Sequence, residues 1–324
     1  MENFEKIFKE YCKNAYEGVV YFKKGEVGYN AQYGIDLDKK IACSGVTKLF
    51  TVACILRLFE NKKLILDSKI TNYLSEEQIK GLCVIKGTDY SNTITIRDLL
   101  YQTSGFNDYF EARVKNAILK SDMGYTFDDK LIWTKSLNGI AKPGKTPYYA
   151  NLNIDLLAYI LEKVTNKPLK EIYKEYIIGP LALKSTYLIE NESTKAYIPA
   201  LYLDGKAQKR PFLLMSSYGS GGLISTPRDL MKFIRGFFSG WIFEEELIDK
   251  LKGFGQIENG YGNILYGGGL MKLKSKRTIL GQIGYSGAFV FADPENKIYC
   301  SGYIAQASDK QLLPKLIAEM FDKI

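Results

Sequence analysis

Apolar side chains recur at helical spacing at the start of the chain and give way to strand-like patterns soon after. The first apolar positions, set three and four residues apart among charged residues, are Phe4, Ile7, Phe8 and Tyr11. This spacing predicts an amphipathic helix. Residues 18–34 hold two runs rich in β-branched and aromatic residues that meet around Lys24-Gly25, which predicts a β-hairpin.

A longer apolar segment, residues 47–59, is hydrophobic on nearly every side. A helix of this composition is surrounded by other parts of the protein, so we expect it near the middle of the fold. Helical periodicity also marks residues 94–101, 151–165 and 169–178. Near the C-terminus, strand-like segments at 261–272, 277–281, 287–293 and 297–305 precede a predicted helix at 309–324.

One hairpin near the start and several strands near the end predict a single antiparallel sheet that is built from both termini and flanked by helices. We therefore expect an α+β fold with an inserted, mostly helical region. The predicted boundaries place residues 1–64 and 226–324 in an α/β sheet region, which includes the buried helix, and residues 65–225 in the helical region. A chain of 324 residues, 46% of them hydrophobic, is large enough to form such a core.

The composition excludes several kinds of chemistry. The chain contains no histidine, which rules out Ser-His-Asp and Cys-His catalysis and imidazole metal ligands. Its five cysteines include no Cys-x-x-Cys pair, so neither a disulfide framework nor a zinc cluster is indicated. We expect no metal and no cofactor, and any proton transfer must use lysine, tyrosine or a carboxylate.

Charge and hydropathy limit the partners that the chain can have. The formal charge of +8 comes from 44 basic and 36 acidic residues that are spread along the chain without a basic block, so we expect no nucleic-acid surface. No apolar run approaches membrane-spanning length, and the first helix lacks the apolar core of a signal peptide. These features predict a cytoplasmic protein, unless a leader has been removed, and they indicate no particular oligomeric state.

Three short segments carry candidate chemistry. Lys48 lies one turn into the buried helix, Tyr149-Ala150-Asn151 leads into the helix at 151–165, and Gln282–Gly287 is a glycine-spaced strand edge on which a substrate backbone could lie. Each has an ordinary structural explanation, because lysines extend to the surface, asparagines cap helices and glycines are common at strand ends. The order and context of the three segments make the set more specific than any one member.

Together these segments resemble the serine β-lactamase and D-alanyl-D-alanine peptidase superfamily, in particular its class C β-lactamase-like branch. Further matching segments are Thr93–Leu100, Thr103-Ser104-Gly105, Ser220–Leu230 and Ala292-Asp293-Pro294. The resemblance covers the chain from about residue 16 to its end. It implies a β-lactamase/transpeptidase-like fold of the α+β class.

The resemblance also implies roles for individual residues. In that family a serine three residues before the lysine attacks an amide, ester or β-lactam carbonyl, so Lys48 corresponds to the base of acylation. Tyr149 corresponds to a second acid/base that is coupled to Lys48, and Asn151 to the side chain that orients Lys48 and the substrate amide. The backbone N–H groups of Gly45 and Tyr285 would form the oxyanion hole. The substrate-binding strand edge would present Gln282, Gly284 and Ser286.

Two positions depart from the family pattern. The nucleophile position is Gly45, which has no side chain to attack a carbonyl. The third motif, usually Lys-Thr-Gly or His-x-Gly, is Gln282-Ile283-Gly284 here. A neutral amide in place of a cation weakens recognition of a substrate carboxylate, because charge-assisted hydrogen bonds are roughly twice as strong as neutral ones.

Three explanations of Gly45 are open. An engineered change has removed a serine, or the glycine is natural in a non-catalytic protein that binds ligands in an inherited cleft, or the adjacent Ser44 is the nucleophile. Ser44 and Lys48 share a helix face at four-residue spacing, but the sequence around Lys48 fits the family without an insertion. The shifted register is therefore the weakest explanation, and Ser44 is expected to cap the helix, with Cys43 as a packing residue.

The sequence thus predicts a β-lactamase-like and penicillin-binding protein-like serine hydrolase lineage that cleaves amides or esters through an acyl-enzyme. This chain would be inactive because of Gly45. The alternative is a non-catalytic ligand- or peptide-binding protein that retains the cleft. In both cases the expected partner is a small molecule or peptide with an amide or ester group.

Overall fold

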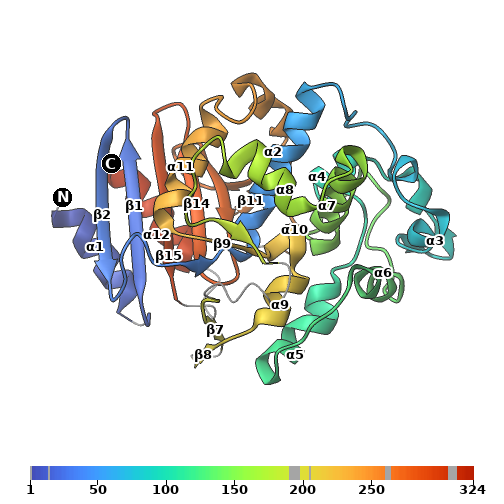
Figure 1. Ribbon diagram of the computed structural model, residues 1–324, viewed down its shortest axis with the longest axis horizontal. Coiled ribbons are helices and arrows are strands. Elements are labelled where there is room, and N and C mark those ends of the chain that lie inside the picture. The colour runs from blue at the N-terminus through green and yellow to red at the C-terminus, as the bar shows by residue number, and fades with distance from the viewer. Residues whose placement is uncertain (1, 14, 190–197, 204–205, 260–263, 306–311) are drawn as a thin grey trace.

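The computed structural model describes residues 2–13, 15–189, 198–203, 206–259, 264–305 and 312–324. Its largest element is an eight-stranded antiparallel sheet that joins the two ends of the chain (Figure 1). Across the sheet the strands are β10 (Gly255–Gln256), β11 (Ile264–Tyr266), β12 (Met271–Leu273), β13 (Ile279–Ile283), β14 (Ala288–Asp293), β15 (Ile298–Ile304), β1 (Gly18–Lys24) and β2 (Val27–Tyr33). The pairing of β1 with β15 confirms the predicted sheet built from both termini.

Helices cover both faces of this sheet. The helices are α1 (Glu2–Cys12), α2 (Thr47–Glu60), α3 (Glu76–Ile79), α4 (Ile96–Leu100), α5 (Lys115–Lys120), α6 (Phe127–Lys135), α7 (Asn151–Thr165), α8 (Leu169–Tyr173), α9 (Pro211–Ser216), α10 (Tyr218–Gly221), α11 (Pro227–Phe238) and α12 (Leu312–Lys323). Phe289 and Phe291 of β14 belong to the core formed with α1 and α12. Val290 and Ala292, which point to the opposite face, belong to the core formed with α11.

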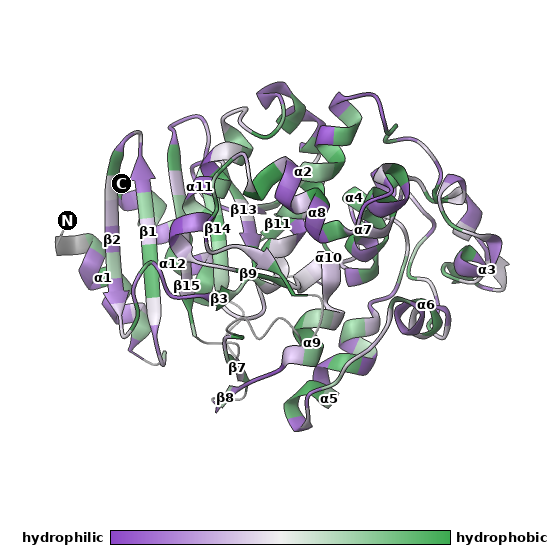
Figure 2. Cartoon of the chain, viewed as in Figure 1, coloured by the Kyte–Doolittle hydropathy of each residue, from purple (hydrophilic) through white to green (hydrophobic). Residues whose placement is uncertain are grey.

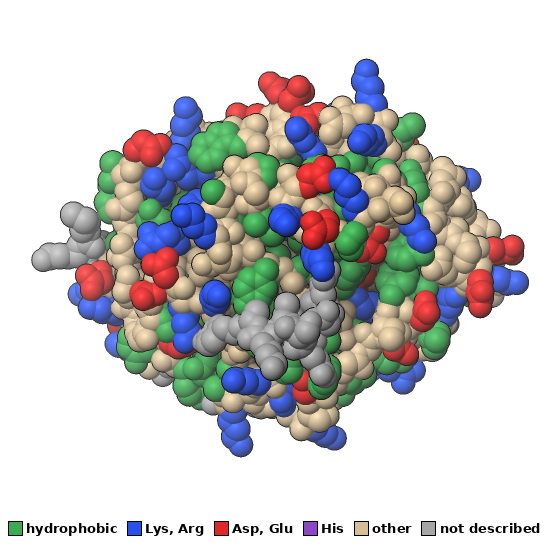
Figure 3. Space-filling model, in the orientation of Figure 1, with side chains coloured by type: hydrophobic (Ala, Val, Ile, Leu, Met, Phe, Trp, Pro, Cys, Tyr) green, Lys and Arg blue, Asp and Glu red, His purple; other side chains and the backbone are tan. Residues whose placement is uncertain are grey.

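Because both faces are covered, every residue of β14 and β15 is buried, and Figure 2 shows β14 as predominantly hydrophobic. At the edge of the sheet, β2 is mostly exposed. On the molecular face of Figure 3, basic and acidic side chains are interspersed, in agreement with the spread of charge along the sequence.

Helix α2 is the buried helix that the sequence predicts. Eleven of its fourteen residues are buried, among them the polar Thr47, Lys48 and Thr51. The helix contacts α7, α8 and α10 of the helical region, and the Thr51 hydroxyl donates to the Gly219 carbonyl 2.8 Å away. These contacts fix α2 against the helical region.

Short strands complete the fold. A three-stranded sheet contains β3 (Ile41–Ala42), β9 (Leu223–Ser225) and β6 (Tyr187–Leu188), and two hairpins are formed by β4 (Val84–Ile85) with β5 (Thr88–Asp89) and by β7 (Leu201–Leu203) with β8 (Lys206–Gln208). None of the helices in the described ranges is both long and apolar enough to cross a lipid bilayer. The division of the chain after residues 64 and 225 stays a prediction.

The structure corrects some element boundaries. The single strand predicted over 261–272 is two strands, β11 and β12, joined through Gly267–Gly269. Gly267 and Gly268 pack against Leu251 and Gly269 against Val52; residues 261–263 lie outside the described part. The helix predicted over 169–178 is α8 followed by a π-helical turn at Lys174–Ile178. Residues 309–311 of the last predicted helix also lie outside the description, and α12 begins at Leu312.

Candidate active site

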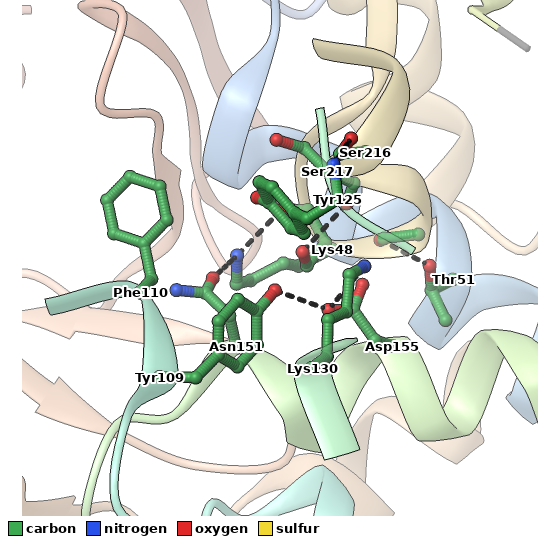
Figure 4. Close-up of polar contacts among 12 residues, drawn as sticks. Lys48, Thr51, Tyr109, Phe110, Tyr125, Lys130, Asn151, Asp155, Ser216 and Ser217 are labelled. Atoms are coloured by element: carbon green, nitrogen blue, oxygen red, sulfur yellow. Dashed lines mark hydrogen bonds and ion pairs between the residues drawn. The ribbon is translucent and has the colours of Figure 1, made fainter. Parts of the chain in front are cut away.

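The Lys48 side chain lies where three distant segments meet. It is only 2% exposed, and its Nζ atom donates to Asn151 Oδ1 at 2.8 Å and to the Ser220 carbonyl at 2.7 Å. The Tyr149 ring centroid is 5.3 Å from the same nitrogen. The structure therefore brings Lys48, Tyr149 and Asn151 together, as the sequence predicts, and Figure 4 shows Asn151 turned toward the Lys48 amine.

Asn151 links this lysine to Asp108, which the sequence analysis missed. Asn151 is the first residue of α7, and Ala150 takes the N-cap position without a side-chain cap, so Asn151 is not the cap. Its backbone N–H donates to Asp108 Oδ1 at 3.1 Å, and its amide nitrogen lies 3.4 Å from both oxygens of the same carboxylate. This contact orients the amide, with its oxygen toward Lys48 and its nitrogen toward Asp108.

Burial shifts the pKa of both ionisable partners. Burial lowers the pKa of Lys48 from 10.5 to about 8, against the opposing attraction of the Asp155 and Asp108 carboxylates. Burial raises the pKa of Asp108 to about 6, although the backbone N–H groups of Asn151 and Phe110 favour its charged form. About one tenth of the Lys48 amine is therefore neutral at pH 7, far more than for an exposed lysine.

A buried ion pair lies one turn further along α7. Lys130 Nζ of α6 is 3.0 Å from Asp155 Oδ2, and both side chains are almost fully buried. The Tyr109 hydroxyl donates to the same Asp155 oxygen at 2.9 Å (Figure 4). The available sequence signal was an aspartate four residues after Asn151, on the same face of an otherwise apolar helix.

Residue 45 lies in a 3₁₀ turn, Ser44–Val46, directly before α2. A Cβ atom at Gly45 would lie 2.4 Å from the Ile283 carbonyl oxygen and 3.3 Å from Gly284 Cα. Similarly, a Cβ atom at Gly284 would lie 2.3 Å from the Cys43 carbonyl oxygen. The end of β13 thus packs directly on the backbone of this turn and occupies the space that a side chain at residue 45 needs.

Ser44 differs from its predicted role, whereas the position of Cys43 agrees with the prediction. Ser44 lines the cleft with a positive φ of 44°, and the turn and α2 have no side-chain cap, so Ser44 does not cap the helix. Cys43 is fully buried, and burial raises the pKa of its thiol. Its placement agrees with a packing role, because a buried, protonated thiol is a poor nucleophile.

The third segment presents alternate residues to the cleft. Ile283 and Tyr285 line it, together with Phe110, Ile257 and Met271. By contrast, the amide of Gln282 is buried and donates to the Gly269 carbonyl at 3.3 Å.

The other two predicted contact residues of that segment are engaged in the fold. Gly284 packs on the turn before α2, and the buried Ser286 hydroxyl donates to the Ala42 carbonyl at 2.6 Å. The predicted substrate-contact positions Gln282, Gly284 and Ser286 therefore face away from the cleft, because side chains of a strand alternate between its two sides.

The arrangement combines a buried amine, a phenol, an amide and an apolar wall in one cleft. Within the described ranges, histidine, cysteine, aspartate and glutamate side chains form no group of three that could hold a metal ion. Lys48, Tyr149 and Asp108 bring an amine, a phenol and a carboxylate to this cleft, which Ser44 and Glu111 also line.

Comparison with known proteins identifies the family. The family model described as Beta-lactamase matches residues 18–311. The chain belongs to the Beta-lactamase family. Among curated relatives of this Beta-lactamase family member, the Teichoic acid D-alanine hydrolase of Staphylococcus aureus is 26% identical over 262 residues, 76% of this chain and 61% of that protein. Protein flp of S. aureus strain MW2 is 28% identical over 177 residues, 52% of this chain and 34% of that protein. The chain thus spans roughly one third to three fifths of the length of these relatives.

Solved structures confirm the β-lactamase/transpeptidase-like α+β fold. A D-stereospecific amidohydrolase from Streptomyces sp. superposes with a TM-score of 0.82 at 21% identity, with 99% of both chains covered. A D-amino acid amidase from Ochrobactrum anthropi SV3 gives a TM-score of 0.83 at 19% identity, covering 99% of this chain and 100% of the other. The penicillin binding protein from Bacillus halodurans gives a TM-score of 0.77 at 19% identity, with 99% of both chains covered.

Proposed function

We propose that this Beta-lactamase family protein binds a small amide or ester ligand in its cleft and forms no acyl-enzyme at residue 45. The observation that carries the proposal is the 2.4 Å separation between a Cβ atom at Gly45 and the Ile283 carbonyl oxygen. Acyl transfer at this position needs a side-chain nucleophile, and the strand end occupies the space for one.

The same contact bears on the origin of the glycine. We adopt the second of the three explanations, in which Gly45 is natural and the inherited cleft serves for binding, because the glycine fits the close packing of Ile283 without strain.

The proposed ligand class combines cleft chemistry with the names of related proteins. A D-stereospecific amidohydrolase, a D-amino acid amidase and a Teichoic acid D-alanine hydrolase are all similar to this chain. The cleft lacks the cation of the third motif, because Gln282 is neutral and buried, and its wall is largely apolar. These features favour an amide or ester of an apolar D-amino acid over a ligand with a free carboxylate.

Isothermal titration calorimetry with D-phenylalanine amide tests the proposal, with the L enantiomer as the stereochemical control. We expect saturable binding of the D enantiomer and no release of phenylalanine above the uncatalysed rate, measured by chromatography. Absence of binding would reject the ligand class. Release of phenylalanine that disappears in a Lys48→Met variant would show that the cleft is catalytic.

A hydrolase that uses Ser44 is the second candidate, because Ser44 lines the cleft. Intact-protein mass spectrometry after treatment with a fluorophosphonate separates the two candidates. We expect no covalent adduct. An adduct that peptide mapping assigns to Ser44, and that a Ser44→Ala variant lacks, would favour the hydrolase.

A further inference from the structure

The hydrogen bonds of the Lys48 amine are those that suit a neutral amine. The Nζ atom donates to two uncharged acceptors, Asn151 Oδ1 and the Ser220 carbonyl, at 2.8 and 2.7 Å. A neutral primary amine has two hydrogens and one lone pair, so two acceptors hold both hydrogens and leave the lone pair available. Asp108 is separated from Lys48 by the Asn151 amide.

Lys130 provides the internal contrast. It is buried to the same degree as Lys48, but its Nζ atom makes a 3.0 Å ion pair with Asp155. A carboxylate at this distance stabilises the ammonium form, which has no lone pair to attack with. Lys48 lines the cleft, whereas Lys130 is not among the lining residues.

Because residue 45 has no side chain, the Lys48 amine has no hydroxyl group at that position to activate. In the family pattern this amine serves a serine hydroxyl, and here no such group stands between it and a ligand in the cleft. We propose that Lys48 is itself the nucleophile of this cleft and forms a reversible imine with an aldehyde or ketone that carries an apolar group. This inference rests on the proposed function in that it uses the same ligand cleft.

The step balances without a further reactant. The Nζ lone pair attacks the carbonyl carbon, a C–N bond forms, and the carbonyl π bond breaks. The resulting carbinolamine loses its C–O bond as the nitrogen lone pair completes the C=N bond. Both amine hydrogens leave with the carbonyl oxygen as one molecule of water, so an amine and a carbonyl compound give an imine and water.

The surroundings of Lys48 favour this chemistry over hydrolysis of an acyl group. The amine lies in a desolvated site, which is how proteins activate lysine as a nucleophile. Its pKa of about 8 results from burial, and it is raised by Asp155 and Asp108 and lowered by Lys130. The Tyr149 ring beside the amine and the apolar side chains of Phe110 and Ile283 suit an aryl or alkyl group.

Reductive trapping tests the inference on the intact protein. The probe is 3-phenylpropanal with sodium cyanoborohydride, which reduces an imine to a stable secondary amine. Peptide mapping by mass spectrometry then gives the rate of labelling at each lysine. At pH 7 we expect Lys48 to be labelled at least about tenfold faster than exposed lysines, because a larger fraction of it is neutral.

Variants at the two buried lysines provide the controls. Lys48→Arg retains a cation but cannot form an imine, and it should abolish the fast labelling; Lys48→Met is a second variant in case arginine disturbs the fold. Lys130→Arg should leave the fast labelling at Lys48 unchanged. Labelling of Lys48 no faster than that of exposed lysines, or fast labelling that persists elsewhere in Lys48→Arg, would overturn the inference.

The trapping experiment and the calorimetric test of the proposed function can succeed or fail independently. Calorimetric binding of D-phenylalanine amide without fast trapping at Lys48 would leave the proposed function standing and reject the imine. Fast trapping without amide binding would support the imine and reject the proposed function. Competition between the two probes would place both in the same cleft.

Discussion

Placing a side chain at residue 45 tests the packing on which the proposed function depends. In Gly45→Ser the new Cβ atom would lie 2.4 Å from the Ile283 carbonyl oxygen. Ordinary contacts of this kind begin near 3.4 Å, so the end of β13 must move by about 1 Å. Overpacking of a well-filled region typically costs about 1–3 kcal/mol.

We therefore expect Gly45→Ser to lower the free energy of unfolding by about 1–3 kcal/mol, which corresponds to a decrease in Tm of about 1.5–4.5 °C for a chain of this size. Gly45→Ala should be destabilised by a similar amount, because it adds the same Cβ atom without the hydroxyl. Gly124→Ala is the matched control, since the nearest neighbours of its Cβ atom would be Phe212 side-chain atoms at ordinary distances of 3.4 Å and more.

Differential scanning fluorimetry and urea unfolding measure these changes, and a fluorescent penicillin tests acylation in the same variants. We expect no adduct in Gly45→Ser, because the end of β13 that must move leads directly into the turn that carries the Tyr285 N–H of the predicted oxyanion hole. A Gly45→Ser protein as stable as the unmodified chain that forms an adduct would refute the reasoning. It would indicate instead that the cleft accepts a serine and that the chain is a hydrolase which has lost its nucleophile.

Two further predictions concern buried charges. Lys130→Met leaves the Asp155 carboxylate buried without its cation, so we expect the free energy of unfolding in urea to fall by about 3–5 kcal/mol. The double variant Lys130→Met/Asp155→Leu should recover most of this loss, and an equal loss in both variants would contradict the prediction. Asp108, which faces Lys48 and Glu111, has a pKa of about 6 in the folded state, compared with 3.8 for an ordinary aspartate. Between these two pH values the folded protein therefore holds a proton on Asp108 that the unfolded protein has lost. Stability should therefore fall by about 3 kcal/mol as the pH rises from about 4 to about 6, and Asp108→Asn should remove this dependence.

Much of the fold follows from local patterns. The helix predicted at 151–165 coincides with α7, and the predicted hairpin coincides with β1 and β2, because both depend on periodicity within one segment. The break between β11 and β12 escaped prediction because Gly267 and Gly268 pack on Leu251 and Gly269 packs on Val52, residues outside this segment. Apolar alternation on both sides of that break resembles one strand when tertiary contacts are unknown.

The site was predictable to the extent that its residues lie in recognisable motifs. Lys48, Tyr149 and Asn151 come together as expected, but Asp108 belongs to no motif that the sequence analysis used. Its role depends on the loop that brings its carboxylate to the first turn of α7. A contact of this kind between a loop and a helix N-terminus carries no periodic signal.

The pair of buried lysines shows why burial alone does not determine the chemistry of an amine. Desolvation lowers the pKa of both Lys48 and Lys130. The difference lies in their partners, because Lys130 has a carboxylate at 3.0 Å whereas the Lys48 amine donates to a carbonyl and an amide oxygen and lies over the Tyr149 ring. A nearby anion restores the ammonium form, while neutral acceptors hold the amine in place without supplying that charge. With glycine at residue 45, the proposed reactivity of the cleft toward carbonyl compounds therefore depends on the Lys48 amine.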